Sequence, residues 1–428
     1  MQDGAVRARG DLVAAGVAVA LVGAAVAVGW WGNHHGTRVW ANAAPLYGVW
    51  RPHTGPGTPL AIAIAAAVVW LGPQWSVRLP WRRLLAVAYP AALAWTMGLA
   101  LVDGWQRGLA GRLTPQGEYL YDLRLAGQLG PLLHGFTRHI IDFRPGSWDT
   151  HVAGHPPGAF GIFVLLDRAG LHGGGWAALL CVAVGATVAV SAPVAVRSLV
   201  DEEAGRAAVP FLVLFPGAVW VGASADGLFA GVTAAGIAWL ASRRPATNFP
   251  GGLALGGGLF LSYGLSLMAL PALATAAQIR RVRTLAVAAA GVAAVVVAFA
   301  AAGFWWPDGY HLVVRRYYQG VASDRPYRYW VWADLACLVL AAGPAVAPVL
   351  RRAVLRPRAN LVPLAAAVAV AIADLSGLSK AETERIWLPF AVWLLAAAWT
   401  LPAPHRRWWL AAQAATALLV NHLVLTNW

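Results

Sequence analysis

Charged residues are scarce in this 428-residue chain. They occupy 12% of the positions, whereas a soluble domain typically carries about 25%. Lysine is almost absent, since Lys380 is the only one, and arginine therefore supplies the net charge of +14. This scarcity excludes an ordinary soluble domain. The arginines fall between apolar blocks, a placement that membrane topology explains better than nucleic-acid binding does.

Cysteine is also rare. Cys181 and Cys337 both lie inside apolar blocks and show no metal-ligand spacing, so we expect neither a disulfide framework nor a cysteine metal site. The sequence also lacks an internal repeat, a low-complexity linker and a glycine-rich phosphate loop. These absences favour one membrane domain and exclude a nucleotide-binding domain.

Apolar residues make up 59% of the chain and gather in blocks, several of which reach the roughly 20 residues that cross a bilayer. In hydrocarbon each backbone polar group must be satisfied within its own segment, and the alternation of a β-barrel is absent, so the blocks predict helices. The first block lacks a small-residue cleavage signal and is read as a retained helix. The blocks are approximately 11–31, 58–75, 83–102, 155–170, 174–197, 207–223, 226–242, 250–279, 284–304, 329–350, 360–376, 386–401 and 406–425.

Arginines in the short loops predict the orientation. The positive-inside rule assigns the clusters around Arg7, Arg82, Arg206, Arg281 and Arg351 to the cytoplasm. Block 250–279 has arginine at both ends, so we expect a hairpin of two short helices turning near residues 262–264. Block 155–170 begins on the outer side and the next block must end on the cytoplasmic side, so the two blocks cannot both cross the membrane. We therefore expect a juxtamembrane or re-entrant helix at 155–170. The expected fold is an all-α polytopic plasma-membrane protein with about 13 crossings, its N-terminus cytoplasmic and its C-terminus outside.

The first outer loop, 103–154, is unusually long for a loop without a function. It begins with Asp103 and contains Glu118 and Asp122, which lie four residues apart and would share a helix face. Each has a structural alternative, namely an interfacial N-cap for Asp103 and a solvated helix face for the pair. His151 and His155 have helical spacing, but the two prolines that follow disfavour a two-histidine metal site and favour a rigid helix entry.

The second outer loop, 304–328, violates the positive-inside rule. Arginines among aromatic residues suit a phosphate at the membrane surface, because guanidinium binds phosphate bidentately. The alternative is an aromatic belt with snorkelling arginines. The arginines are Arg315, Arg316, Arg325 and Arg328.

The third outer loop, 376–385, concentrates charges of both signs. An ion pair between Lys380 and Glu384, four residues apart, is the structural interpretation. Asp226 adds a carboxylate at the outer start of its helix, and ionisable groups at membrane depth are candidates for function. The charged residues of the loop are Lys380, Glu382, Glu384 and Arg385.

The order and sidedness of these motifs resemble the GT-C superfamily of integral-membrane glycosyltransferases. Asp103 matches the acidic residue that precedes the first large outer loop of those enzymes. His155-Pro156-Pro157 matches their His-Pro-Pro motif, with Gly158 where many relatives have leucine. The segment Ser224–Phe229, around Asp226, looks like an acidic outer helix start of the family. The short-helix pair around Ser262–Gly264, with Tyr263, is also similar, and Glu382–Trp387 looks like a late outer motif. The resemblance covers roughly 83–400, so residues 1–82 look like two additional N-terminal helices before a catalytic domain at 83–428.

The resemblance implies transfer of a sugar from a polyprenyl-phosphate carrier to an envelope glycan or glycolipid on the outer face. It implies a base from Asp103, or from Glu118 and Asp122, because Gly104 stands where many members have a second acidic residue. The GC-rich, actinobacterial type of composition makes mannose or arabinose the expected sugar. No cofactor is demanded, although the carboxylates could hold Mg²⁺ or Mn²⁺. The expected substrate-binding residues are His151, His155, Asp226, Tyr263, Arg315, Arg316, Arg325, Lys380, Glu382, Glu384 and Arg385.

Two other functions compete with this interpretation. A transporter or lipid flippase of the envelope would explain carboxylates at membrane depth, but it predicts an internal repeat that the sequence lacks. A non-catalytic assembly protein would tolerate the loss of the outer acidic and histidine residues. Membrane lipids are expected neighbours under every interpretation, and nucleic acid under none.

Overall fold

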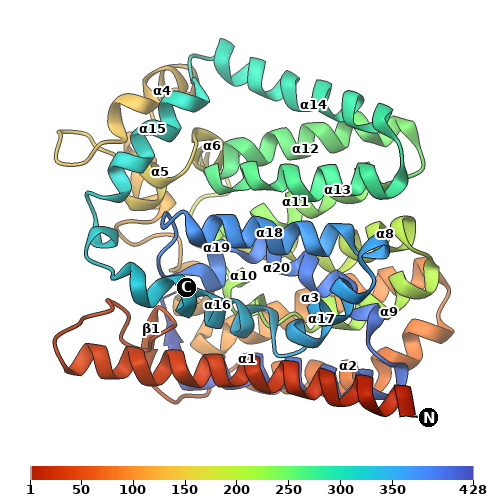
Figure 1. Ribbon diagram of the computed structural model, residues 1–428. Helices are drawn as coiled ribbons and strands as arrows, with labels where there is room; N and C mark the ends of the chain where they lie inside the picture. Colours follow the sequence, from red (N-terminus) through yellow and green to blue (C-terminus); the bar gives the residue numbers. More distant parts are fainter. Residues whose placement is uncertain (1, 428) are drawn as a thin grey trace.

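The computed structural model describes residues 2–427 and is built almost entirely of helices (Figure 1). Many of these helices are short, and four of them, α2, α3, α8 and α9, contain an internal proline. The α-helices are α1 Gln2–His34, α2 Thr58–Arg78, α3 Trp81–Ala100, α4 Leu129–Gly135, α5 Thr150–Gly154, α6 Pro157–Arg168, α7 Gly174–Ala186, α8 Val188–Leu199, α9 Glu202–Val213, α10 Ala218–Val221, α11 Ala225–Ala241, α12 Asn248–Leu261, α13 Ala269–Ile279, α14 Val282–Ala301, α15 Trp306–Tyr317, α16 Tyr327–Ala342, α17 Val346–Leu355, α18 Leu361–Leu375, α19 Thr383–Ile386, α20 Leu388–Leu395 and α21 Arg406–Leu423.

Several helices have the length and composition of membrane spans. Within residues 2–427 there are five that are long and apolar enough, or up to six if a bent pair is counted as one. Shorter apolar helices accompany them, among them Ala225–Ala241 and Leu361–Leu375. The five are Ala8–His34, Thr58–Arg78, Trp81–Asp103, Gly174–Leu199 and Val282–Ala301. The helical class expected from composition is therefore confirmed, with five or six helices that could cross a membrane.

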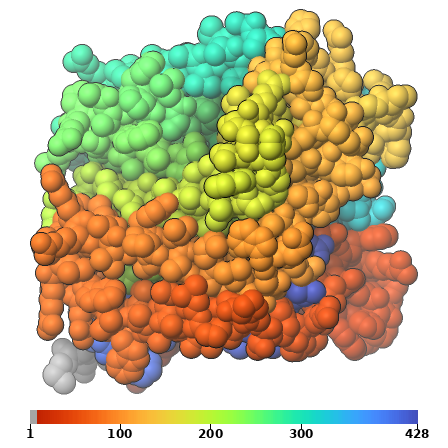
Figure 2. Space-filling view, turned by 180° about the vertical axis from the view of Figure 1, so that it is seen from behind, coloured from red at the N-terminus to blue at the C-terminus, as the bar shows by residue number. Residues whose placement is uncertain are grey.

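The helices lie side by side with their loops gathered at two opposite ends (Figure 1). One end, here called the loop end, carries α4, α5, α15, β1 and the C-terminus. The opposite end, here called the arginine end, holds the N-terminus. Seen from behind, red and orange N-terminal segments form the lower part of the molecule, green and teal segments form the upper left, and light orange to yellow segments form the upper right (Figure 2).

Hydrogen bonds of the short-loop arginines hold the arginine end together. Arg206 donates to the carbonyl oxygens of Ser76 and Leu79 at the end of α2, at 3.1 and 2.7 Å. Arg281, before α14, donates to the carbonyl oxygen of Arg243 at 3.2 Å. Arginine clusters far apart in the sequence thus lie at one end of the bundle.

Helix α6 begins and ends beside the first outer loop. Pro156 and Pro157 fix its start, and at its last residue the guanidinium of Arg168 donates to the carbonyl oxygen of Gly127 in that loop. Helix α7 then begins at Gly174, packed against the backbone of Ala110 in the same loop. The structure thus has a short helix of 12 residues at the place where the sequence predicts one.

Two breaks shape the helical blocks. The expected hairpin at 250–279 is present as α12 and α13, separated by Ser262 in extended conformation and a 3-10 turn over Tyr263–Met268. The block 329–350, expected as one helix, instead bends by 99° between α16 and α17. Gly343 turns the chain there with φ of +80°. The buried amide of Gln413 donates to the carbonyl oxygen of Ala342 and accepts from the N–H of Ala345, which replaces helical hydrogen bonds lost at the bend.

A two-stranded antiparallel sheet corrects the all-α expectation. Strand β1, Gly48–Trp50, pairs with β2, Val424–Thr426, with Gly48 opposite Thr426. The pairing joins the segment between α1 and α2 to the C-terminal end of the chain.

The first helix, α1, packs against later parts of the chain. Asp11 of α1 is buried and receives charged hydrogen bonds from Arg351 and Arg352 of α17, the latter at 2.6 Å. Tyr329 of α16 donates its hydroxyl hydrogen to the carbonyl oxygen of Ala25 at 2.8 Å. These contacts bring the segment after α1 to the loop end, beside the charged side chains described next.

A buried ion-pair network at the loop end

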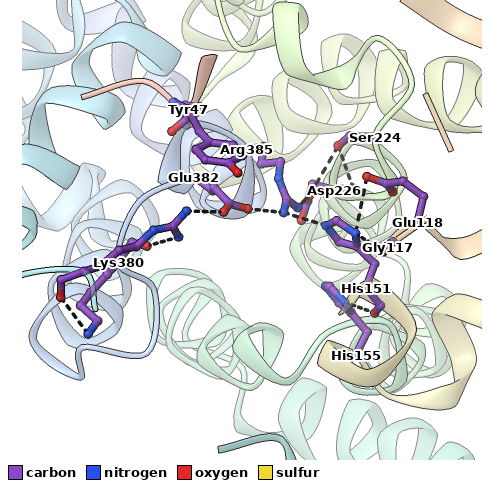
Figure 3. Close-up of polar contacts among 12 residues, drawn as sticks. Tyr47, Gly117, Glu118, His151, His155, Ser224, Asp226, Lys380, Glu382 and Arg385 are labelled. Carbon is purple, nitrogen blue, oxygen red and sulfur yellow. Dashed lines mark hydrogen bonds and ion pairs between the residues drawn. The ribbon is translucent and has the colours of Figure 1, made fainter. Parts of the chain in front are cut away.

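Arg385 is the centre of the polar network. Its guanidinium donates to Asp226 at 2.6 Å, to Glu382 at 2.8 Å and to the ring of His151 at 3.0 Å (Figure 3). The Arg385 side chain is 7% exposed. Burial alone would lower the pKa of Arg385, but the carboxylates of Asp226 and Glu382 raise it above its ordinary value. The network therefore joins three segments, from α5, α11 and α19, around one permanent cation.

Asp226 is positioned by the start of α11. Ser224 is the N-cap residue, and its hydroxyl oxygen accepts from the N–H of Asp226 at 3.1 Å. This places the carboxylate in the first turn, where the helix dipole favours negative charge. The helix start expected from the sequence is thus present, and its acidic residue contacts Arg385.

Hydrogen bonds define the tautomers of His151 and His155. The ring Nδ1 of His151 donates to the carbonyl oxygen of Gly117 at 2.7 Å, so its Nε2 accepts from Arg385. The Nδ1 of His155 donates to the carbonyl oxygen of His151 at 2.8 Å. Burial lowers the pKa of His155 to about 4, so this ring is neutral near pH 7 and cannot be a cationic phosphate ligand. In residues 2–427 no group of three metal-type side chains is found.

Glu382 bridges two arginines. One of its oxygens accepts from Arg325 at 2.9 Å and the other from Arg385 at 2.8 Å. Burial would raise the pKa of Glu382, but the two guanidiniums lower it below its ordinary value, so the side chain is ionised. Lys380 joins the same cluster through its ammonium group, which donates to the carbonyl oxygen of Arg325 at 3.1 Å.

Glu384 is turned away from Lys380, so the expected ion pair between them does not form. Residues 380–382 are not helical, and the four-residue spacing therefore does not place the two side chains on one face. The Glu384 carboxylate instead accepts from the N–H of Tyr47 at 3.1 Å. Burial raises the pKa of Glu384 to about 7, which makes it a titratable group near neutral pH.

Asp103 lies in a neighbouring cluster of the loop end. Its carboxylate pairs with His53 at 2.7 Å, Arg112 at 2.9 Å and Arg107 at 3.4 Å. Both arginines also donate to the carbonyl oxygen of Thr426 in β2. Sequence reasoning missed His53, Arg112 and Tyr47, because their partners lie far away in the sequence or have no recognisable spacing. It also missed Arg107, although Arg107 stands four residues after Asp103, a spacing that could have revealed the pair.

Glu118 and Asp122 do not share a helix face, contrary to the expectation. Residues Tyr119–Leu125 form a 3-10 helix, in which side chains four residues apart diverge. Glu118 approaches Nδ1 of His151 at 3.5 Å. Asp122 is fully buried and accepts from the N–H of Asp149 at 2.7 Å, so it secures the loop and lies out of reach of solvent.

The second loop, 304–328, contributes fewer residues to the Arg385 network than its sequence indicates. Arg316 pairs with Asp142 of the first loop, and Arg315 is exposed on α15 without an ion pair to any described residue. Tyr263 packs against the rings of Trp306 and Tyr310, at 5.3 and 5.9 Å between centroids. Of the three expected phosphate-binding arginines of this loop, the structure brings Arg325 alone into the network.

Fold and site define a helical membrane-type protein with a buried network of cations and carboxylates at its loop end. No family model, curated protein or solved structure matches this chain. Arginines held within reach of carboxylates and imidazoles suit binding of an anion together with proton transfer beside it.

Proposed function

We propose that this protein is a membrane-embedded glycosyltransferase of the GT-C type. It moves a sugar from a polyprenyl-phosphate carrier to an envelope glycan or glycolipid on the outer face of the plasma membrane. One observation carries the proposal: Arg325, Lys380 and Arg385 gather at the loop end, directly beside Glu118 and His151 of the long first loop. Binding of a lipid phosphate beside a carboxylate base needs this combination of groups.

We further propose thirteen crossings with a cytoplasmic N-terminus. The long helices would be joined by broken or shorter ones, such as α9 with α10 and α20 with the 3-10 turn after it, while α6 stays at the outer surface. The clustering of short-loop arginines at the end opposite the network supports this orientation, because cytoplasmic loops carry the excess of arginine.

In the proposed reaction the donor phosphate lies against Arg325, Arg385 and Lys380. An acceptor hydroxyl loses its proton to Glu118, and its oxygen forms a bond to the anomeric carbon. The bond between that carbon and the phosphate oxygen breaks, and the negative charge passes to the phosphate. The cations stabilise this charge as it develops, which is where preorganised charges are most effective.

Glu118 is the better candidate for the base among the three acidic residues of the first loop that the sequence analysis singled out. It contacts His151, which in turn contacts Arg385, so it lies next to the proposed phosphate site. The carboxylate oxygens of Asp103 are already engaged by His53 and Arg112. Asp122 is buried against the backbone of its own loop.

A transfer assay tests the proposal. Purified protein in detergent is given a panel of radiolabelled polyprenyl-phosphate sugars and envelope acceptors, with and without EDTA. We expect Glu118→Gln to reduce transfer by about 10²–10⁴-fold, the usual contribution of a general base. Asp103→Asn should keep measurable activity, and Asp167→Asn should match wild type, because Asp167 pairs with His172 in an exposed position outside the network.

The outcomes separate the competing functions. Loss of transfer in a folded Asp103→Asn variant, with activity kept in Glu118→Gln, would move the base to Asp103. Absence of transfer by the wild-type protein across the whole panel would contradict a transferase and favour a transporter or flippase. Loss of transfer with EDTA, restored by Mg²⁺ or Mn²⁺, would add a divalent cation to the site.

A further inference from the structure

Glu382 occupies the position between two arginines that an incoming phosphate would need. Its two carboxylate oxygens accept from different guanidiniums, Arg325 at 2.9 Å and Arg385 at 2.8 Å (Figure 3). A phosphate group presents two oxygens in the same way, and guanidinium binds both anions with matching geometry. The side chain thus resembles the phosphate in charge sign and in its contacts.

The backbone that carries Glu382 is held in an uncommon conformation. Ala381 and Glu382 have φ of +67° and +64°, a left-handed region that residues other than glycine seldom adopt. Asp334 of α16 holds this turn, because its carboxylate accepts from the N–H of Ala381 at 3.2 Å and from the hydroxyl of Thr383 at 3.1 Å. Such strain persists where the surroundings enforce it, and it is typical of functional sites. Here it directs Glu382 between the arginines.

The charges around Glu382 would change on phosphate binding. Arg385 keeps Asp226 as a second partner, whereas Arg325 has Glu382 as its only carboxylate among residues 2–427. Lys380 lies beside Arg325 and adds a third cation. A phosphate that replaced the Glu382 carboxylate would therefore restore the charge balance of Arg325 and Arg385 without disturbing Asp226.

We propose that Glu382 is a displaceable internal substitute for the phosphate of the lipid donor. It keeps Arg325 and Arg385 paired and in place while the site is empty, and it leaves when a lipid phosphate enters. The affinity for lipid phosphate is then set by competition between the two anions. This inference rests on the proposed function, because it assigns the phosphate site of that reaction.

The test measures binding of a sugar-free probe, so it does not depend on transfer. Farnesyl phosphate is titrated into purified protein in detergent, with farnesol as the control for the lipid chain. Glu382→Gln removes the competing charge and should bind farnesyl phosphate at least about tenfold more tightly than wild type, a difference that one lost charged hydrogen bond can supply. Arg325→Gln should abolish phosphate-dependent binding.

The chain offers a matched control. Glu202 also bridges two arginines, Arg197 at 2.6 Å and Arg206 at 2.7 Å, but it lies at the arginine end. Glu202→Gln should leave the affinity for farnesyl phosphate unchanged. An equal gain in Glu202→Gln would show that net charge alone attracts the probe and would overturn the inference.

Folding is checked by thermal melting of each variant with and without the probe. If Glu382→Gln does not fold, Glu382→Asp replaces it, since the shorter side chain cannot span both arginines and should also bind the probe more tightly. Equal affinity in wild type and the folded Glu382 variant, with loss in Arg325→Gln, would overturn the displacement while leaving the phosphate site intact. Absence of phosphate-dependent binding in all variants would overturn both the inference and the proposed function.

Discussion

The ion pair between Arg385 and Asp226 leads to an asymmetric stability prediction. Both side chains are 7% exposed, and the nitrogen and oxygen lie 2.6 Å apart. Arg385→Gln leaves Asp226 buried without another ion-pair partner among the described residues. Asp226→Asn instead leaves Arg385 paired with Glu382. Removal of the cation should therefore be the more harmful change.

The magnitudes follow from the burial of the pair. Removing one partner of a buried ion pair costs about 3–5 kcal/mol, because the remaining charge stays buried without compensation. We expect Arg385→Gln to fall in that range. Asp226→Asn should cost about 1–3 kcal/mol, the value of a lost charged hydrogen bond with its donor still partly satisfied. The double variant should cost less than the sum of the two, since it leaves no orphaned carboxylate.

The assay is unfolding in mixed detergent micelles, followed by the fluorescence of the 23 tryptophans. Asp167→Asn is the control, because its exposed pair with His172 should contribute about 0–1 kcal/mol. Two results would refute the reasoning. One is a larger loss in Asp226→Asn than in Arg385→Gln, and the other is additivity of the two changes within about 0.5 kcal/mol, as for independent sites.

Three further predictions concern pH, a second buried ion pair and helix packing. Burial raises the pKa of Glu384 from 4.5 to about 7, so its contribution to stability is fully present below pH 4.5 and is lost as the pH rises to about 7. Glu384→Gln should flatten this part of the curve of melting temperature against pH. Asp11→Asn orphans buried Arg352 and should lower the unfolding free energy by about 3–5 kcal/mol in the same detergent titration. Gly252→Ala forces a methyl group onto the backbone of α14 and should cost about 1–3 kcal/mol, whereas Gly16→Ala, in open space on α1, should be neutral or slightly stabilising.

The sequence alone determined the helical class, the apolar blocks that could cross a membrane and their approximate bounds. These features follow from local rules, because a long apolar block must satisfy its own backbone hydrogen bonds in lipid whatever lies around it. The break near Ser262 and the short helix at 155–170 were also predictable, since they follow from the charges that flank each block. The roles of Glu118, Lys380 and Arg385 in transfer stay predictions.

The tertiary structure decided which charges meet. Arg385 pairs with Asp226, 159 residues earlier in the chain, and Asp103 pairs with His53, 50 residues earlier. The ion pair predicted from the four-residue spacing of Lys380 and Glu384 does not form, because the segment is not helical there. Which distant side chains form ion pairs depends on how the helices pack and where they break. Neither the packing nor the breaks leave a periodic signal in the sequence.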